Sequence, residues 1–472
     1  MNPLRNIPSV NELLESPPLR ALVDRISHSA VVSTVRTVLE EVRSEVQSAA
    51  VERTLPSVTE LAERIARRVM ETETSSLRPV INATGALWGA GLGRAPLAED
   101  AVEEMAAVAR DYAGLEVDLA TGRRSSRTAA VEGLLKELTG AEAALVVNNH
   151  AGATMLAFDA LAAGREVIVS RGELVELADG FRLPEMIAAS GAVLREVGTT
   201  NQTRPDDYAN AIGPETAALM LVHTSEFALV GNVGSVRLED LTEVGRKHSI
   251  PVIHDVGPGA LLAQSEFGLP DEPVVSESLK AGADLVLASG DKLVGGPQSG
   301  LILGRRALVE QIGRHPTARA FRVGKLTLAG LAATLRLYRD PKRAQRQIPV
   351  LSLLNTSVEN LKGRAERLAP QLAATPAVSR AEPIDGVSFL DGGSSPLCRL
   401  PTWSIAIRPE GMTADRLAAA LSQGVPAVLG RAEEGRLVLD LRTVAPRQDQ
   451  PLVEAFAALG RKPPEKGAGE KN

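Results

Sequence analysis

The chain has 472 residues, of which 44% are apolar and 3% are aromatic, and its formal net charge is −6. This length predicts two or three domains, and the dominance of Ala, Leu, Val and Gly is typical of helices packed on a sheet rather than of a β-sandwich. The acidic balance argues against a purely electrostatic nucleic-acid binder, although it leaves room for a local basic patch. The single cysteine, Cys398, excludes an internal disulfide and a cysteine-cluster metal site.

No apolar run approaches the length of a membrane span, and polar residues follow the opening Met1-Asn2-Pro3-Leu4-Arg5, which is no secretory signal. The six histidines are scattered and form no His-x-x-x-His pair. We therefore expect a cytoplasmic protein that has neither a membrane segment nor a metal site.

Residues 1–78 are predicted to form a small helical domain. Ser9 followed by Glu12 is the signature of a capping box, and apolar residues recur at helical spacing from Leu19 to about Ala50 and from Ser57 to about Thr72. The domain contains ten arginines, no lysine and eleven carboxylates. Such arginines suit RNA phosphates, but a solvated face crossed by salt bridges accounts for the same charges equally well.

Residues 79–338 are predicted to form a large α/β domain, because short apolar runs alternate there with helical patterns. This alternation indicates a mostly parallel sheet with helices on both faces. The apolar runs are 144–147, 166–169, 218–222, 252–253, 285–288 and 301–303.

Residues 339–460 are predicted to form a smaller α+β domain, and residues 461–472 a disordered tail. An arginine-rich segment, 341–347, leads into a long helical pattern. The expected strands of this domain are 403–408, 427–429 and 437–441.

Lys292 lies in a glycine-rich turn between two apolar runs, 283–288 and 300–303. Each run has the pattern of a buried strand, so we expect Lys292 at a strand end. A lysine held against an apolar sheet end loses hydration, which favours its neutral, nucleophilic amine. This placement is typical of a lysine that forms a Schiff base with pyridoxal phosphate (PLP), and the hydroxyl of Ser289 suits the cofactor's phosphate. A surface lysine in a Gly-Pro turn is the alternative.

Asp255 ends another apolar run, in the sequence Pro-Val-Ile-His-Asp. PLP chemistry needs a carboxylate beside the pyridinium nitrogen, because the protonated ring is the electron sink of the reaction. Asp255 is our candidate for this carboxylate. The alternative is an aspartate that only caps the following turn.

Asn149 and His150 lie where the apolar run 144–147 gives way to small residues that open a helix. A helix N-terminus offers N–H groups to an anion, so this segment is a candidate phosphate site. Either His150 or His223, which follows the run 218–222, is a candidate to stack on the cofactor ring. Each histidine is equally consistent with a hydrogen-bonded core residue.

Arginines recur at predicted turns. They include Arg94, Arg127, and the pair Arg319 and Arg322. If several of these guanidinium groups converge on one pocket, they bind a phosphate-like co-substrate in bidentate fashion. Taken one at a time, each is more typical of a surface ion pair.

These residues and several longer motifs resemble the bacterial selenocysteine synthase family, the L-seryl-tRNA(Sec) selenium transferases. The resemblance extends over nearly the whole chain. The motifs are LRxIPSV (4–10), INATG (81–85), LGRAPL (92–97), VSRGELVE (169–176), VGTTN (197–201), SGDKL (289–293) and KLTL (325–328).

The resemblance implies the type I PLP-dependent transferase fold, with Lys292 as the Schiff-base lysine and Arg94, Arg127, Arg319 and Arg322 around the selenium donor. It also implies that residues 1–78 grip the tRNA and that the chain forms a homo-oligomer, typically a decamer. The implied reaction converts L-seryl-tRNA(Sec) to L-selenocysteinyl-tRNA(Sec) with selenophosphate, by way of a PLP aminoacrylate intermediate.

The sequence departs from the family's pattern near Trp88, Pro258 and Gly324, and in the segment 224–227. A related PLP-dependent lyase, acting on a free small amino acid or a phosphorylated amino sugar, is therefore the alternative enzyme. Relatives of that kind commonly lack the helical domain, so residues 1–78 favour the tRNA enzyme. A tRNA-binding protein without catalysis is a third possibility, which Lys292 and Asp255 argue against.

Overall fold

The structure is a computed structural model in which residues 80–472 form one compact unit and residues 1–79 another. The predicted tail, Cys398 and the segment 224–226 lie outside the described residues. None of the described helices is long and apolar enough to cross a membrane. The described residues are 7–48, 56–73, 77–89, 91–174, 176–177, 180–223, 227, 229–269, 272–391 and 399–459.

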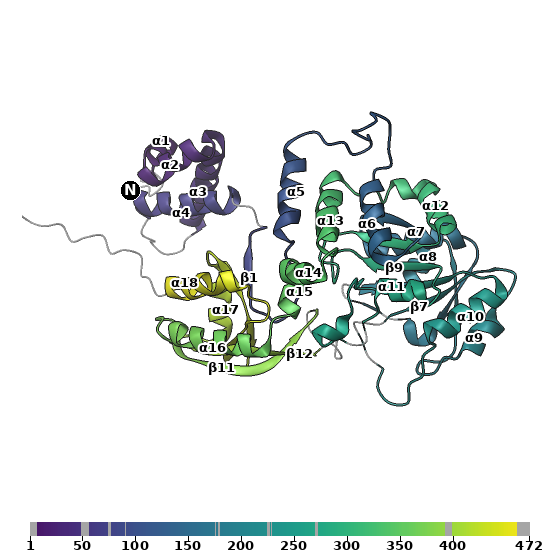
Figure 1. Cartoon of the computed structure of the whole chain (residues 1–472). Coiled ribbons are helices and arrows are strands. Elements are labelled where there is room, and N and C mark those ends of the chain that lie inside the picture. The colour runs from purple at the N-terminus through teal and green to yellow at the C-terminus, as the bar shows by residue number, and fades with distance from the viewer. Residues whose placement is uncertain are drawn as a thin grey trace, which may run out of the picture. The chain divides into compact units, whose positions relative to one another are not determined.

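The first unit is helical, as predicted, and is drawn in purple in Figure 1. Its capping box is confirmed, since the Glu12 N–H donates to the Ser9 hydroxyl at 3.2 Å and the Ser9 N–H donates to the Glu12 carboxylate at 3.4 Å. Apolar side chains from all of its helices form one core. The helices are α1 (Val10–Leu14), α2 (Pro17–Arg25), α3 (His28–Ser48) and α4 (Val58–Glu73).

The helical spacing predicted from Leu19 onward is confirmed for the described residues, but it belongs to two helices, because α2 ends at Arg25 and α3 begins at His28. Ile26 leaves the helical conformation, with φ −111° and ψ −83°. The Ser27 hydroxyl then accepts the Ala30 N–H at 3.4 Å, which is the contact expected of a residue that caps a new helix. The apolar spacing continues across this break, so the pattern alone does not reveal it.

Some arginines of the first unit form salt bridges and others remain exposed, so each of the two interpretations of their charge applies to a part of them. Glu41 on α3 accepts hydrogen bonds from Arg64 and Arg68 on α4, at 3.2 and 3.4 Å. These contacts form a salt-bridged face between the two helices. A second group is exposed and has no carboxylate partner among the described residues: Arg20, Arg25, Arg36 and Arg67.

The centre of the second unit is a seven-stranded sheet in the order β2-β10-β9-β8-β7-β3-β6, in which β9, β8, β7, β3 and β6 are parallel and β10 is antiparallel to both of its neighbours. All the strands predicted for the large domain are confirmed. The strand β6 was missed because Arg195 and Glu196 interrupt its apolar pattern at this sheet edge. The strands are β2 (Ala143–Val147), β3 (Glu166–Ser170), β6 (Val193–Val197), β7 (Thr216–Val222), β8 (Val252–Asp255), β9 (Leu285–Ser289) and β10 (Gly300–Gly304).

Helices cover both faces of this sheet (Figure 1). Successive residues of β9 face opposite sides, so Val286 and Ala288 join one apolar core while Leu285 and Leu287 join the other. The helices and short strands around the sheet are α5 (Glu99–Arg110), α6 (Ala129–Thr139), α7 (His150–Ala162), β4 (Glu176–Leu177), β5 (Phe181–Arg182), α8 (Leu183–Ala189), α9 (Pro205–Ala211), α10 (Leu238–His248), α11 (Val275–Lys280), α12 (Arg306–Arg314) and α13 (Lys325–Leu337).

The C-terminal part is built on a four-stranded antiparallel sheet in the order β11-β12-β15-β14, in which β12 and β15 confirm the predicted strands 403–408 and 437–441. The third predicted strand, 427–429, is confirmed as β13, outside this sheet. The strand β1 (Val80–Asn82) pairs with β13 (Ala427–Leu429) of this part, although the sequence assigns it to the large domain. The boundary at 338 stays a prediction. The other elements are α14 (Pro341–Gln347), α15 (Pro349–Leu354), α16 (Val358–Ala373), β11 (Val378–Phe389), β12 (Arg399–Pro409), α17 (Ala414–Gln423), β14 (Arg431–Glu433), β15 (Arg436–Asp440) and α18 (Asp449–Leu459).

At the end of β9, the backbone of Gly259 lies close to the Ser289 carbonyl oxygen. Gly259 has φ +75°, and a Cβ atom at this position would lie 2.5 Å from that oxygen. We predict that Gly259→Ala lowers stability more than Gly268→Ala. Gly268 has a similar φ of +77° but an open surrounding, so its substitution adds only backbone strain, on the order of 1 kcal/mol. Thermal unfolding of both variants tests this, and equal losses would contradict the steric argument.

Candidate active site

The candidate site lies where the parallel strands β7, β8 and β9 end. Val222 pairs with Asp255, and Asp255 with Leu287, so the three strand ends are in register. Lys292 follows β9 in the turn to the antiparallel strand β10, and it is half-buried. The predicted placement of Lys292 at a strand end is confirmed. The carboxyl edge of a parallel sheet is where ligands of α/β folds usually bind.

Asp255 is buried at this edge and carries a negative charge. Burial alone would raise the pKa of its carboxyl group, but the charge and hydrogen bond of His150, together with the Gly257 N–H, hold that pKa below its usual value. The Nε2 atom of His150 lies 2.9 Å from Asp255 Oδ1, and the Gly257 N–H donates to the same oxygen at 2.9 Å. Asp255 therefore caps the following turn and also presents an ionised carboxylate at the strand end.

The two candidate histidines differ in what they contact. His150 is the first residue of α7 and turns toward Asp255. His223 donates its backbone N–H to the Asp255 carbonyl at 2.8 Å, but its ring lies 3.2 Å from Glu272. Since only His150 reaches the Asp255 carboxylate, it is the better placed of the two beside a group bound there.

The start of α7 has the geometry of an anion site. The Asn149 side chain accepts the Gly152 N–H at 2.7 Å as the N-cap of this helix. A side chain on Gly300 of β10 would collide with the Asn149 backbone. Because glycine has none, β10 and the start of α7 lie in close contact. Ser289 is buried at the end of the neighbouring strand β9. Backbone N–H groups at a helix N-terminus bind phosphate well.

This set of residues fits PLP. Lys292 offers an amine, Asp255 an ionised carboxylate for the ring nitrogen, and the start of α7 a place for the phosphate. Among the described residues, no group of three or more His, Cys, Asp or Glu side chains has the arrangement of a metal site.

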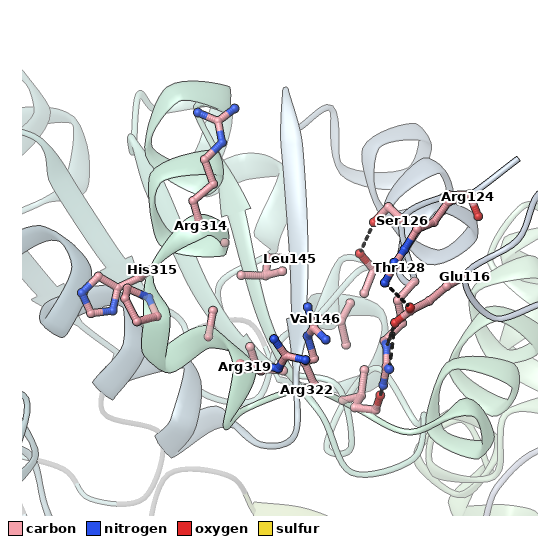
Figure 2. A pocket seen from close by; sticks show the side chains of 17 residues that line it. Glu116, Arg124, Ser126, Thr128, Leu145, Val146, Arg314, His315, Arg319 and Arg322 are labelled. Atoms are coloured by element: carbon pink, nitrogen blue, oxygen red, sulfur yellow. Dashed lines mark hydrogen bonds and ion pairs between the residues drawn. The ribbon is translucent and has the colours of Figure 1, made fainter.

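Three of the four predicted arginines line one cavity of about 450 Å³. Arg319 and Arg322 point into it, as Figure 2 shows. Arg127 lines the same cavity and is held by Glu116, to which its Nε and Nη2 atoms donate at 3.1 and 2.9 Å. Glu116 was missed, because nothing in the spacing of Glu116 and Arg127 signals the pair.

Arg94 does not line this cavity. Its Nε atom donates to Asp291 Oδ2 at 3.0 Å, directly before Lys292, and its side chain lines a second cavity. Three of the four arginines therefore share one cavity and Arg94 does not, and their role around a selenium donor stays a prediction. Arg94 differs because it is carried by a loop that packs between the Lys292 turn and the C-terminal part.

Trp88, Pro258 and Gly324, which depart from the family pattern, are all described. Pro258 is buried, and its carbonyl accepts the Leu293 N–H at 3.1 Å, directly after Lys292. Trp88 is buried in the core, and its backbone N–H donates to the Leu390 carbonyl at 3.0 Å. Gly324 precedes α13 and has open space where a side chain would lie. The departure from the family pattern at Trp88 therefore affects the packing of the core.

Glu173 is a buried acid that sequence reasoning missed, although it lies within the motif VSRGELVE. It follows β3 and accepts the Val222 N–H at 2.8 Å, and it shares a cavity of about 440 Å³ with His223 and His254. Burial raises the pKa of Glu173 to about 8, partly offset by the Val222 N–H. The side chain is therefore mostly protonated at neutral pH.

The folded protein binds the Glu173 proton more tightly than the unfolded chain does. The stability that this proton gives the fold is therefore complete below the ordinary pKa of 4.5, and it is lost as the pH rises through about 8. Glutamine mimics the protonated acid and keeps an acceptor for the Val222 N–H. We predict that Glu173→Gln becomes more stable than the original protein as the pH rises from 5.5 to 8, by more than about 1 kcal/mol.

Denaturant unfolding at several pH values measures this difference. Glu103→Gln, at an exposed position of α5, is the matched control and should follow the original protein at every pH. Parallel curves for Glu173→Gln and the original protein would contradict the buried, protonated acid.

Comparison with known proteins identifies the family. Residues 80–445 match the family described as L-seryl-tRNA selenium transferase, and residues 4–43 match the family described as selenocysteine synthase N terminal. The L-seryl-tRNA(Sec) selenium transferase of Geobacter sulfurreducens is 43% identical, over 96% of this chain and 98% of its own. That of Moorella thermoacetica is 45% identical, over 96% of both chains.

Among solved structures, D-glucosaminate-6-phosphate ammonia-lyase resembles the chain with a TM-score of 0.57, at 23% identity, over 83% of this chain and 97% of its own. This likeness concerns the fold. The two family matches cover part of the helical unit and most of the α/β unit, and the relatives match over nearly their whole length. The chain therefore belongs to the L-seryl-tRNA selenium transferase family.

Proposed function

We propose that this chain converts L-seryl-tRNA(Sec) to L-selenocysteinyl-tRNA(Sec), with PLP as cofactor and selenophosphate as selenium donor. Family membership supports the reaction. The observation that carries the proposal is the ionised, buried Asp255 in register with the strand that leads to Lys292. The neighbouring arginine cavity supports an anionic donor.

PLP, when bound, supplies an electron sink for negative charge at the substrate's α-carbon. Asp255 would hold a proton on the ring nitrogen, which its own ionised state permits. Lys292 would anchor the cofactor through Nζ and then remove the α-proton of the seryl group with the same amine. His150 orients the Asp255 carboxylate and covers it from the start of α7.

Arg127, Arg319 and Arg322 would bind and orient selenophosphate. Glu116 and the Val323 carbonyl hold the Arg127 guanidinium in place. The Asn148 N–H donates to the Phe321 carbonyl at 3.0 Å, which places the residue before Arg322 against the strand that leads into α7. The arginine cavity, which Val147 lines, therefore lies along the strand that leads into the proposed phosphate site.

Lys292→Ala tests the role of the lysine. We predict that selenocysteinyl-tRNA formation falls by more than about 100-fold, because the general base is lost. The visible absorbance of the bound cofactor should shift as well, whereas the unfolding temperature of the protein should change little, since Lys292 is not a core residue. A Lys292→Ala protein that keeps substantial activity would refute the mechanism.

The double variant Arg319→Gln/Arg322→Gln tests the donor site. A hydrogen bond to a charged group contributes about 1.5–3 kcal/mol, so the KM for selenophosphate should rise by at least about 10-fold. The KM for seryl-tRNA(Sec) is the internal control and should stay within about twofold. An equal rise in both values would mean that the two arginines serve the fold rather than the donor.

The alternative function, a PLP-dependent lyase for a free small amino acid or a phosphorylated amino sugar, is suggested by the fold of the ammonia-lyase. The helical unit and its match to the selenocysteine synthase N-terminal family favour the tRNA enzyme. Changes in the cofactor's absorbance separate the two, since seryl-tRNA(Sec) should alter the band and free serine or an amino sugar phosphate should not.

The helical unit is proposed to bind the tRNA, and its exposed arginines on α2, α3 and α4 supply charge for phosphates. We also propose a homo-oligomer, a decamer by resemblance to the family. The cytoplasm is the proposed location, because aminoacyl-tRNA is made and used there.

A further inference from the structure

A second cavity, of about 320 Å³, lies within the unit formed by residues 80–472. It is enclosed by the loop 87–96, by α14 and α15, and by the turn 443–448. Four arginines and no acidic residue are among the described residues that line it: Arg94, Arg346, Arg364 and Arg447. This excess of positive charge is unusual in a chain whose net charge is −6.

Two of these arginines already have partners. Arg364 is buried and donates to Asp449 at 2.5 Å and to the Val444 carbonyl at 2.8 Å. Arg94 donates to Asp291. Their charges therefore serve contacts within the protein.

Arg346 and Arg447 differ from that pair. Both are exposed, and neither has an ion pair or side-chain hydrogen bond with any described residue. They come from α14 and from the turn before α18, which lie about a hundred residues apart in the sequence but line the same cavity. Two uncompensated guanidinium groups in one cavity form a site for an anion, and planar guanidinium suits phosphate.

The cavity is connected to the catalytic lysine through Arg94. This residue lines the cavity, while its Nε atom lies 3.0 Å from Asp291, the residue before Lys292. A ligand held by Arg346 and Arg447 would thus share the cavity with Arg94, which contacts the residue before Lys292. Apolar side chains, among them Leu87, Leu92 and Leu353, also line the cavity.

We propose that this cavity binds the phosphodiester backbone at the aminoacylated 3′ end of the substrate tRNA, through Arg346 and Arg447. The inference rests on the proposed function and adds a contact for the end of the tRNA, separate from the helical unit. The cavity's volume is at the lower end of the range of small-ligand sites, which suits one nucleotide and its phosphate rather than a folded RNA element.

The test compares two RNAs and uses the full chain loaded with cofactor. One RNA is complete seryl-tRNA(Sec), and the other is the same tRNA without its three terminal nucleotides. In Arg346→Gln/Arg447→Gln, affinity for the complete tRNA should fall by at least about 10-fold, while affinity for the shortened tRNA stays unchanged. The slope of log K against log salt for the complete tRNA should fall by about 1.4, because two contacts to a single strand are lost.

Arg416→Gln is the matched control, because Arg416 is exposed on α17, has no side-chain partner among the described residues and does not line the cavity. It removes one charge of the same kind and should bind both RNAs as the original protein does. Arg346→Lys/Arg447→Lys keeps the charges and should recover most of the lost affinity and salt dependence.

Three outcomes would overturn the inference. If the double glutamine variant lowers the affinity for both RNAs equally, or for neither, the 3′ end is not the ligand. A raised KM for selenophosphate with unchanged tRNA affinity would instead assign the cavity to a small free phosphate. If the original protein binds no seryl-tRNA(Sec), the proposed function itself fails, and that result is visible before any variant is made.

Discussion

The buried negative charge of Asp255 is the constraint on which the rest of the site depends. A carboxylate removed from water must be compensated, and here the compensation comes from His150 and from the Gly257 N–H. His150 is the first residue of α7, so the contact also determines where that helix begins relative to β8. The proposed ring site and the proposed phosphate site are thereby held together by one interaction.

Two buried acids near the same edge of the sheet differ in charge, since one is ionised and the other is protonated. Asp255 and Glu173 are both buried, yet the pKa of Asp255 is lowered while that of Glu173 is raised to about 8. The difference arises from their neighbours, since Asp255 contacts an imidazole and Glu173 receives only a backbone N–H. A carboxylate beside the cofactor must be ionised, whereas a protonated acid can form part of the packed wall.

Positive charge is likewise divided between two places. Arg127, Arg319 and Arg322 line the cavity next to the start of α7, and Arg346 and Arg447 line the cavity beside the loop 87–96. Two anionic substrates, a small donor and the end of a long RNA, require two such places if both are to reach one lysine. In the proposed function, the first cavity would hold the selenium donor and the second the 3′ end of the tRNA.

The sequence by itself determined six of the seven strands of the large sheet, the position of Lys292 at a strand end and the family resemblance, because these depend on local periodicity and on short motifs. It did not reveal the break at Ile26, the edge strand β6, or the roles of Glu116 and Glu173. Only the tertiary structure decided which arginines converge and which carboxyl group is ionised. Both properties depend on burial and on partners brought together by strand order from distant parts of the chain, which no local pattern records.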